Sequence, residues 1–273
     1  SGSEGYGRVR LWGGAGFGAS VLCFGWAVGG LPYAEAGARA VPVFIALTGG
    51  VALVSLALNV RLPNTRPATT SAYGRLVRSP GLIALLAISC LHWGAISVFN
   101  VFYGLYVAEL GFSAAVPGIG VAVSVSLEVV VFFYARQLFR FRPAHWWILP
   151  CLLVSILRWV MTAQVTSAVS VVAWQATHGI SFALWFAAMM KVLDDYAPGE
   201  QRIGIQGLFA AIAISGGGML GTWGGGVLME LWSGRVMFFG AAVMEGMAVL
   251  LLLSTRRLFH TVRFDPESSQ SLP

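Results

Sequence analysis

Apolar residues gather in long runs along this chain, and short polar or charged breaks separate the runs. A bilayer core takes roughly 20 apolar residues per helix. On that measure the runs predict about eight membrane-spanning helices, near residues 11–31, 41–60, 81–107, 114–135, 145–165, 168–190, 203–232 and 236–255. The third and seventh runs are longer than one span, so these helices must tilt or break. The pattern predicts an all-α integral membrane protein.

Composition agrees, because 57% of the 273 residues are hydrophobic, 10% are charged and the mean hydropathy is +0.77. The formal net charge of +6 would suit a nucleic-acid partner, but most basic residues fall at every second junction between predicted helices, and the intervening junctions hold only Arg39 and Arg235. Cytoplasmic loops of membrane proteins are rich in Lys and Arg, so this placement indicates topology and excludes nucleic acid as the partner. Both ends of the chain are predicted to be cytoplasmic. The basic junctions hold Arg8, Arg10, Arg61, Arg66, Arg75, Arg78, Arg136, Arg140, Arg142, Lys191, Arg202, Arg256, Arg257 and Arg263.

The longest polar connection, RLPNTRPATTSAYGRLVRSP at residues 61–80, is rich in Pro, Thr, Ser and Arg, which is typical of a linker between helical bundles. It separates two helices within residues 1–60 from six within residues 81–258, and residues 259–273 follow as a cytoplasmic tail. Two helices against six is a lopsided arrangement for a transporter, and the first residue is neither an initiator Met nor the start of a signal peptide. We therefore expect N-terminal helices to be missing.

Small residues recur four positions apart in several predicted helices: Gly14 and Gly18, Gly25 and Gly29, and Gly217, Gly221 and Gly225. This spacing lines one helical face and predicts close helix packing, or alternatively a helix that bends during a transport cycle. The cysteines lack CxxC or metal-type spacing and are interpreted as small core residues without a metal or redox role: Cys23, Cys90 and Cys151.

Five ionisable side chains lie inside predicted helices rather than at their ends: Glu128, Arg158, Glu245, His92 and His178. A charge at the centre of a membrane helix is costly, so such groups face a partner or a wet cavity. At about 1.5 Å of rise per residue, Glu128 lies roughly 12 Å from its cytoplasmic helix end, and Arg158 and His178 lie roughly 19 Å from their helix ends. These three groups, on consecutive helices, can surround one cavity near the middle of the membrane.

A carboxylate, a guanidinium and an imidazole together suit proton-coupled transport. Movement of Arg158 relative to Glu128 would change the proton affinity of the carboxylate, and His178 can relay or sense the proton. The alternative is a permanent structural ion pair between Glu128 and Arg158, with His178 as a hydrogen-bonded core residue.

The two remaining groups stay ambiguous. Glu245 is on the last helix, and peripheral helices often face lipid or the linker. His92 shares its helix with Asn100 and Tyr103, and aromatic rings with one amide and one imidazole suit an organic ligand. Ordinary hydrogen bonding between helices explains these residues equally well.

The opening segment YGRVRLWGGAGFGASVLCFG resembles the helix-five entry of major facilitator superfamily transporters of the phenylpropionate permease group, related to lactose permease. SLEVVVFFYARQLF, LRWVMTA and THGISFALWFAAMMKVL resemble later helices of the same group, in the same order. The resemblance covers nearly the whole chain as helices five to twelve of a twelve-helix bundle. It implies that the first four helices are missing and that the missing helices would complete the solute cavity.

The resemblance also implies site residues. Arg10 matches an arginine that contacts sugar in lactose permease, and Phe17 occupies the place of a stacking tryptophan. Glu128, Arg158 and His178 match the helix-eight glutamate, the helix-nine arginine and the helix-ten histidine, which serve proton coupling and ligand binding.

This chain departs from lactose permease on either side of that histidine. Ser181 stands in place of the proton-carrying glutamate, and Gln175 stands in place of a lysine. A less polar substrate than a disaccharide, such as an aromatic acid, suits this simpler cavity, with Arg10 and Arg158 as countercharges.

The sequence thus predicts a secondary transporter in the bacterial cytoplasmic (inner) membrane, a proton symporter of a small organic solute that works by alternating access. It predicts no enzyme activity and no cofactor beyond the proton gradient. The alternative is a non-transporting assembly factor or receptor of the same fold, with Glu128 and Arg158 as a fixed pair.

Overall fold

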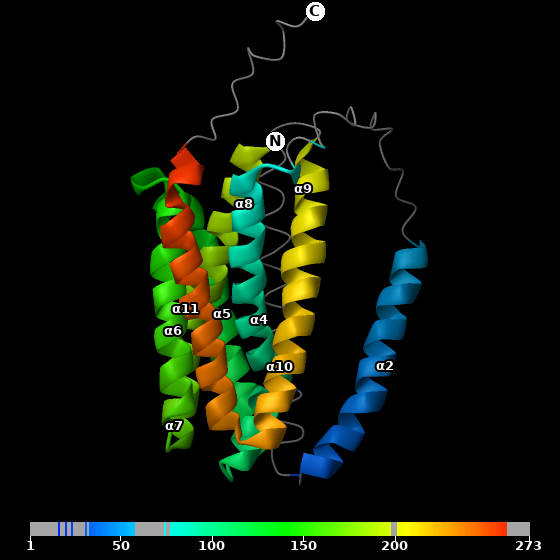
Figure 1. The fold of residues 1–273 in the computed structure, drawn as a ribbon. Helices are drawn as coiled ribbons and strands as arrows, with labels where there is room; N and C mark the ends of the chain where they lie inside the picture. Colours follow the sequence, from blue (N-terminus) through cyan, green and yellow to red (C-terminus); the bar gives the residue numbers. More distant parts are fainter. Residues whose placement is uncertain are drawn as a thin grey trace, which may run out of the picture.

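The computed structural model describes residues 33–57, 77–197 and 201–260, together with the isolated residues Gly16, Ser20, Cys23, Leu31 and Gly74. The secondary structure of this part of the chain is helical, as predicted. Most of its helices are α-helices, whereas η1 and η2 are π-helices. In chain order the elements are α2 (Tyr33–Ala57), α4 (Pro80–Glu109), α5 (Ala115–Phe141), α6 (His145–Ala163), α7 (Ala168–Gln175), η1 (Gly179–Leu184), α8 (Trp185–Tyr196), α9 (Gln201–Phe209), η2 (Ala210–Gly217), α10 (Gly218–Leu231) and α11 (Gly234–His260). Figure 1 shows these helices upright in a bundle, with α2 beside it.

Seven helical segments of the described chain are long and apolar enough to cross a membrane. Six of the predicted spans correspond to α4, α5, α6, the continuous segment Ala168–Tyr196, the continuous segment Gln201–Leu231 and α11. The predicted span at 41–60 corresponds to α2, which begins earlier, at Tyr33. The Ala-rich start of α2 explains this difference, because Ala has the highest helix propensity. The predicted first span at 11–31 lies outside the described residues apart from four isolated positions.

The two over-long runs behave differently. The third forms one continuous helix, α4, whereas the seventh contains the π-helical segment η2 in its middle. A second π-helical segment, η1, interrupts the span at 168–196. Single π-helical turns inside α-helices often occur at functional sites.

Helix α4 lies at the centre of the bundle. It packs against α10, η2 and α11, and 72% of its most hydrophobic window is buried. The corresponding windows of α5 and of the segment Gln201–Leu231 are only 22% buried, and that of α2 contains no buried residue. The helices of residues 81–258 thus form a bundle around α4, whose outer faces are apolar.

Glycines allow η2 and α10 to approach α4 closely. A Cβ atom at Gly217 would lie 2.3 Å from the carbonyl oxygen of Cys90, and one at Gly221 would lie 2.0 Å from that of Gly94. A Cβ atom at Gly225 would meet a side-chain carbon of Val98 at 3.1 Å. The predicted close packing is confirmed for this face, whereas Gly14, Gly18, Gly25 and Gly29 lie outside the described residues.

Two helix ends have local signals in the sequence. Gly111 follows α4 with a φ of +77°, a conformation that glycine adopts without strain. The amides of Gly111 and Phe112 donate to the carbonyls of Ala108 and Val107 at 2.9 and 3.2 Å, which is a Schellman motif. At the start of α7, Ser167 accepts a hydrogen bond from the amide of Ser170 in a capping box.

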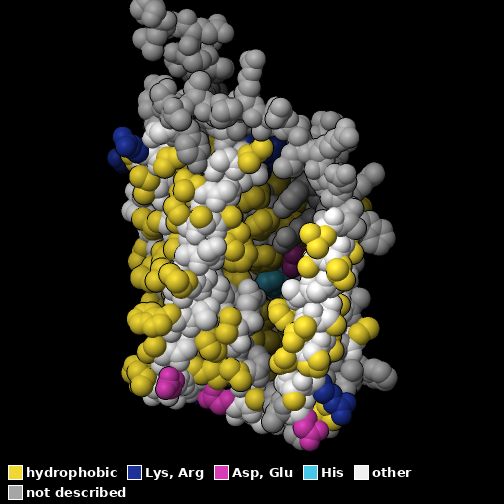
Figure 2. Space-filling view, turned by 90° about the vertical axis from the view of Figure 1, so that its right-hand side faces the viewer, with side chains coloured by type: hydrophobic (Ala, Val, Ile, Leu, Met, Phe, Trp, Pro, Cys, Tyr) yellow, Lys and Arg dark blue, Asp and Glu magenta, His cyan; other side chains and the backbone are white. Residues whose placement is uncertain are grey.

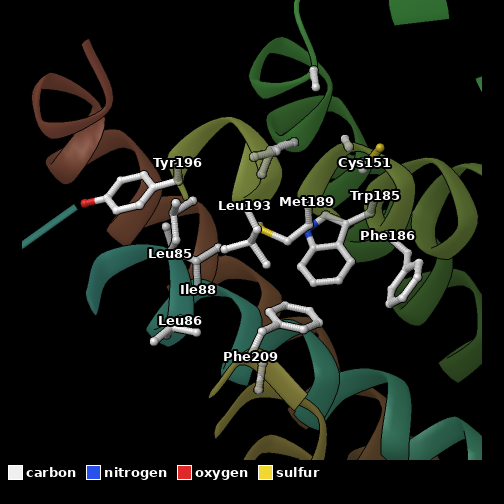
Figure 3. Close-up of a cluster of buried hydrophobic side chains, with 14 of the residues drawn as sticks. Leu85, Leu86, Ile88, Cys151, Trp185, Phe186, Met189, Leu193, Tyr196 and Phe209 are labelled. Carbon is white, nitrogen blue, oxygen red and sulfur yellow. The ribbon is translucent and has the colours of Figure 1, made fainter. Parts of the chain in front are cut away.

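The buried apolar residues form two clusters. In the first, Met189 and Leu193 of α8 face Leu85 and Ile88 of α4 (Figure 3). The second contains Phe99 and Tyr106 of α4 with Trp159 and Phe238, among others. Polar side chains near the middle of the helices are buried with these clusters: His92, Ser155, Arg158, Gln175, His178, Ser181 and Glu245. Cys151 belongs to the first cluster, whereas Cys23 is exposed, so its expected core placement is wrong.

Candidate functional site

Arg158 is the centre of a buried polar group. Its guanidinium, fully buried on α6, lies 2.7 Å from Nδ1 of His178 and donates to Oε1 of Gln175 at 2.8 Å. A longer contact of 3.4 Å reaches the hydroxyl of Ser181. Gln175, His178 and Ser181 all lie where α7 passes into η1, so the span at 168–196 holds Arg158 from three positions.

His178 connects Arg158 to Glu128. A guanidinium can only donate, so Nδ1 of His178 accepts the bond from Arg158 and the neutral ring carries its proton on Nε2. Nε2 lies 3.8 Å from Oε2 of Glu128 on α5. This distance exceeds a direct hydrogen bond, so an approach of about 1 Å or a bridging water would connect the two groups. The imidazole therefore lies between the carboxylate and the guanidinium, bonded to Arg158 through Nδ1 and with Nε2 near Glu128.

Aromatic rings enclose this polar group. The guanidinium carbon of Arg158 lies 4.4 Å from the ring centroid of Phe99 and 4.3 Å from that of Trp159, which are cation–π distances. Phe182 stacks on His178 with ring centroids 4.8 Å apart. The rings exclude water from the Arg158 guanidinium, which strengthens its electrostatic interactions with neighbouring groups.

Gly179 brings α5 and η1 together at the site. A Cβ atom at this position would lie 2.9 Å from the carbonyl oxygen of Leu127 and 3.1 Å from a methyl group of Val131. Gly179 directly follows His178, and Leu127 directly precedes Glu128. The missing side chain at Gly179 thus permits the separation observed between Glu128 and His178.

Part of this group is incompletely buried. The side chains of Glu128 and His178 remain 12% and 8% exposed, in contrast to the fully buried Arg158. Figure 2 views the molecule from the side of α2 in Figure 1 and shows histidine and acidic side chains in a hollow of this surface. Glu128 and His178 are therefore the more accessible members of the group, and Arg158 is enclosed.

A second buried polar group lies around Glu245 of α11. Both carboxylate oxygens approach Nδ1 of His92, at 2.9 and 3.0 Å, and Oε1 accepts from the Ser155 hydroxyl at 2.6 Å. Nε1 of Trp159 donates to the same oxygen at 3.4 Å. The ring of His92 also lies 4.0 Å from that of Trp185. The carboxylate therefore joins α4, α6 and α11 in the interior of the bundle, and Glu245 does not face lipid.

The remaining predicted site residues are dispersed. Arg10 and Phe17 lie outside the described residues. His92 belongs to the Glu245 group, and Asn100 is exposed on α4. Tyr103 is buried beside the polar group of Glu128, His178 and Arg158, which we call the Glu128 group. Its ring lies 4.7 Å from that of Phe99.

Sequence reasoning missed the aromatic rings that surround Arg158 and the hydroxyl of Ser155. Phe99 lies four residues before the predicted Tyr103, on the same face of α4, and this spacing could have indicated Phe99. Trp159 follows Arg158 directly, but nothing in its position shows that it packs beside the guanidinium. The residues that the structure describes contain no group of three or more His, Cys, Asp or Glu side chains that could hold a metal ion.

Comparison with known proteins agrees with this architecture. The sequence pattern of the MFS_1 like family matches residues 1–240. The chain belongs to this family. This confirms the predicted membership of the major facilitator superfamily and the all-α membrane fold. The chain is a multi-pass integral membrane protein.

Two relatives of this chain are named after different substrates. It is 29% identical over 262 residues to the maltose permease of Geobacillus stearothermophilus, covering 92% of this chain. It is 26% identical over 253 residues to a probable 3-phenylpropionic acid transporter of Escherichia coli strain K12, covering 90% of this chain. The chain spans 64% of the length of each of these relatives.

A solved structure shares the fold. A bacterial homologue of the human lysosomal transporter Spinster, in an inward-facing and unoccupied conformation, matches with a TM-score of 0.63 at 15% identity. The match covers 93% of this MFS chain and 66% of that chain. At this identity the match shows the fold alone.

Proposed function

We propose that the protein is a secondary active transporter that moves a small organic solute together with protons by alternating access. The observation that carries this proposal is the line of ionisable side chains from Glu128 through His178 to Arg158. Buried ionisable groups in membrane helices are costly and mark substrate or proton pathways. Family membership supports the transporter class, and proton coupling rests on these three side chains.

Proton coupling follows from the arrangement of the imidazole. Glu128 takes up a proton when its face of the bundle is open to water, since it is the most accessible member of the group. The protonated carboxyl becomes a donor, which changes its interaction with Nε2 of His178. His178 passes this change to Arg158 through Nδ1. Protonation would therefore alter how firmly Arg158 is held near Gln175 and Ser181, and hence its availability to a solute.

We favour an aromatic acid as the solute. The guanidinium of Arg158 between the rings of Phe99 and Trp159 offers a cation and aromatic surfaces, which suit a carboxylate attached to a ring. The similarity to a probable 3-phenylpropionic acid transporter supports this choice. A sugar is the second candidate, because the chain is also similar to a maltose permease.

We place the protein in a bacterial cytoplasmic membrane, with both ends of this chain on the cytoplasmic side. The support is the basic character of one end of the bundle, where Arg140, Arg142, Lys191 and Arg256 lie. Because the named relatives are longer, we also propose that four further helices complete the solute cavity.

Uptake into vesicles tests the proposal. The full-length protein would be reconstituted and given labelled 3-phenylpropionate or labelled maltose, with and without an imposed pH gradient. We expect accumulation of the aromatic acid to require the gradient and to be lost in Glu128→Gln. The exposed Glu230→Gln is the matched control and should accumulate solute normally.

Each other outcome has a defined meaning. Gradient-driven accumulation of maltose alone would replace the aromatic acid by a sugar. Normal coupled uptake by Glu128→Gln would give the carboxylate a structural role. Absence of uptake across a wide panel of acids, sugars and nucleosides would favour the non-transporting alternative, an assembly factor or receptor of this fold.

A further inference from the structure

A cavity of about 550 Å³ opens at the basic end of the bundle, away from the Glu128 group. It lies between the ends of five helical segments, α4, α5, α6, α8 and α11, and shares no residue with the site described above. Cavities that bind small molecules usually measure roughly 300–1,000 Å³, so this one is large enough for a ligand. Its walls and mouth differ in chemistry.

The inner wall is apolar. Leu85 and Ile148 are each only 2% exposed and form the floor, and Phe139, Val192 and Leu252 complete the sides. A small inorganic anion gains nothing from such a wall, because apolar burial stabilises only an apolar group. The occupant therefore has a substantial hydrocarbon part.

The mouth is basic. Lys191 of α8, His145 of α6 and Arg256 of α11 line it, and Asp195 is the carboxylate among the lining residues. Asp195 forms an ion pair with Lys191 one helical turn away, so this pair is neutral overall and Arg256 provides the net positive charge. An occupant with a negative charge next to its hydrocarbon part matches this distribution.

Trp146 gives the mouth the character of a membrane interface. Its side chain is 59% exposed at the start of α6, and the guanidinium carbon of Arg142 lies 5.4 Å from its ring centroid. Tryptophan is enriched where the hydrocarbon core meets the head groups, and Arg beside it is favoured there as well. These residue types are typical of the level of the phospholipid phosphates.

We propose that this cavity binds an anionic phospholipid from the cytoplasmic leaflet. One acyl chain lies along Leu85, Ile148 and Leu252, and the phosphate lies between Arg256 and Lys191. Basic pockets between membrane helices on the cytoplasmic side are known to accept anionic head groups. The bound lipid joins α11 to α6 and α8 at one end of the bundle. The proposal rests on the membrane orientation given above and not on the transport activity.

Native mass spectrometry of the full-length protein, delipidated in detergent, tests this proposal. The protein would be titrated with phosphatidylglycerol and with phosphatidylcholine of identical acyl chains. We expect one phosphatidylglycerol to bind several-fold more tightly than phosphatidylcholine. Arg256→Gln and Lys191→Gln should each weaken phosphatidylglycerol binding by about five-fold, as expected for one charge at a membrane surface.

Arg257→Gln is the matched control, since Arg257 is the exposed neighbour of Arg256 and does not line the cavity. This variant should bind phosphatidylglycerol like the unmodified protein. Equal affinity for both lipids, or equal loss in Arg256→Gln and Arg257→Gln, would overturn the proposal. Displacement of the lipid by millimolar inorganic phosphate would also overturn it, because a soluble phosphate compound would then be the occupant. The uptake-deficient Glu128→Gln should bind lipid normally, so the two proposals fail separately.

Discussion

Nδ1 of His178 lies 2.7 Å from the guanidinium of Arg158, and the geometry makes the imidazole the acceptor of this bond. The opposite nitrogen, Nε2, then faces Glu128 as an N–H donor. One ring thus senses the carboxylate with one nitrogen and the guanidinium with the other. This relationship gives His178 two separable roles, which substitutions can divide.

His178→Asn should separate these roles. The amide oxygen of Asn can replace Nδ1 as the acceptor for Arg158, but the shorter side chain has no atom at the position of Nε2. We expect solute binding, measured by calorimetry on the purified protein, to be largely retained. Accumulation driven by a pH gradient should fall to the level seen without the gradient. His178→Gln is the comparison, because its longer amide reaches toward Glu128 and should recover part of the coupling. Full coupling in His178→Asn would exclude the imidazole as the relay.

Glu245→Gln should destabilise the bundle. The carboxylate accepts bonds from His92, Ser155 and Trp159 in a fully buried setting. The Gln amide keeps one acceptor oxygen, but its NH2 group cannot accept a bond, so a buried polar contact is lost. Leaving a buried polar group without its partner costs about 1–3 kcal/mol, so the free energy of unfolding in detergent should fall by that order. The exposed Glu230→Gln should change it by less than about 0.5 kcal/mol. Unchanged stability together with loss of gradient-driven uptake would instead place Glu245 in the proton path.

Gly221→Ala and Gly224→Ala on the same helix should differ in sign. A Cβ atom at Gly221 would lie 2.0 Å from the backbone oxygen of Gly94, whereas one at Gly224 meets nothing within 4 Å. The first substitution forces α10 away from α4 and should cost about 1–3 kcal/mol of unfolding free energy. The second replaces glycine inside a helix and should stabilise the protein by roughly 0.5–1 kcal/mol. Equal effects of the two would show that α10 does not pack against α4 in this way.

Much of the candidate site could be anticipated from residue type alone. Glu128, Arg158 and His178 are conspicuous because each interrupts an apolar run, and desolvation makes an isolated charge there improbable. The structure brings these three together with Gln175 and Ser181, and their transport roles remain predictions. The partner of His92 could not be anticipated, because Glu245 lies 153 residues away and helix order does not reveal which faces meet.

The apolar runs alone establish the fold class and most spans, because hydrocarbon admits only helices whose backbone polar groups are satisfied within the segment. The predicted span at 81–107, for example, differs from α4 by one residue at its start and two at its end. Side-chain pairing required the folded molecule, since it depends on the rotation and approach of packed helices. The absent Cβ atom of Gly179, set against the carbonyl of Leu127, permits the approach of α5 that brings Glu128 to His178. Such contacts join residues far apart along the chain, and hydrophobic periodicity carries no information about them.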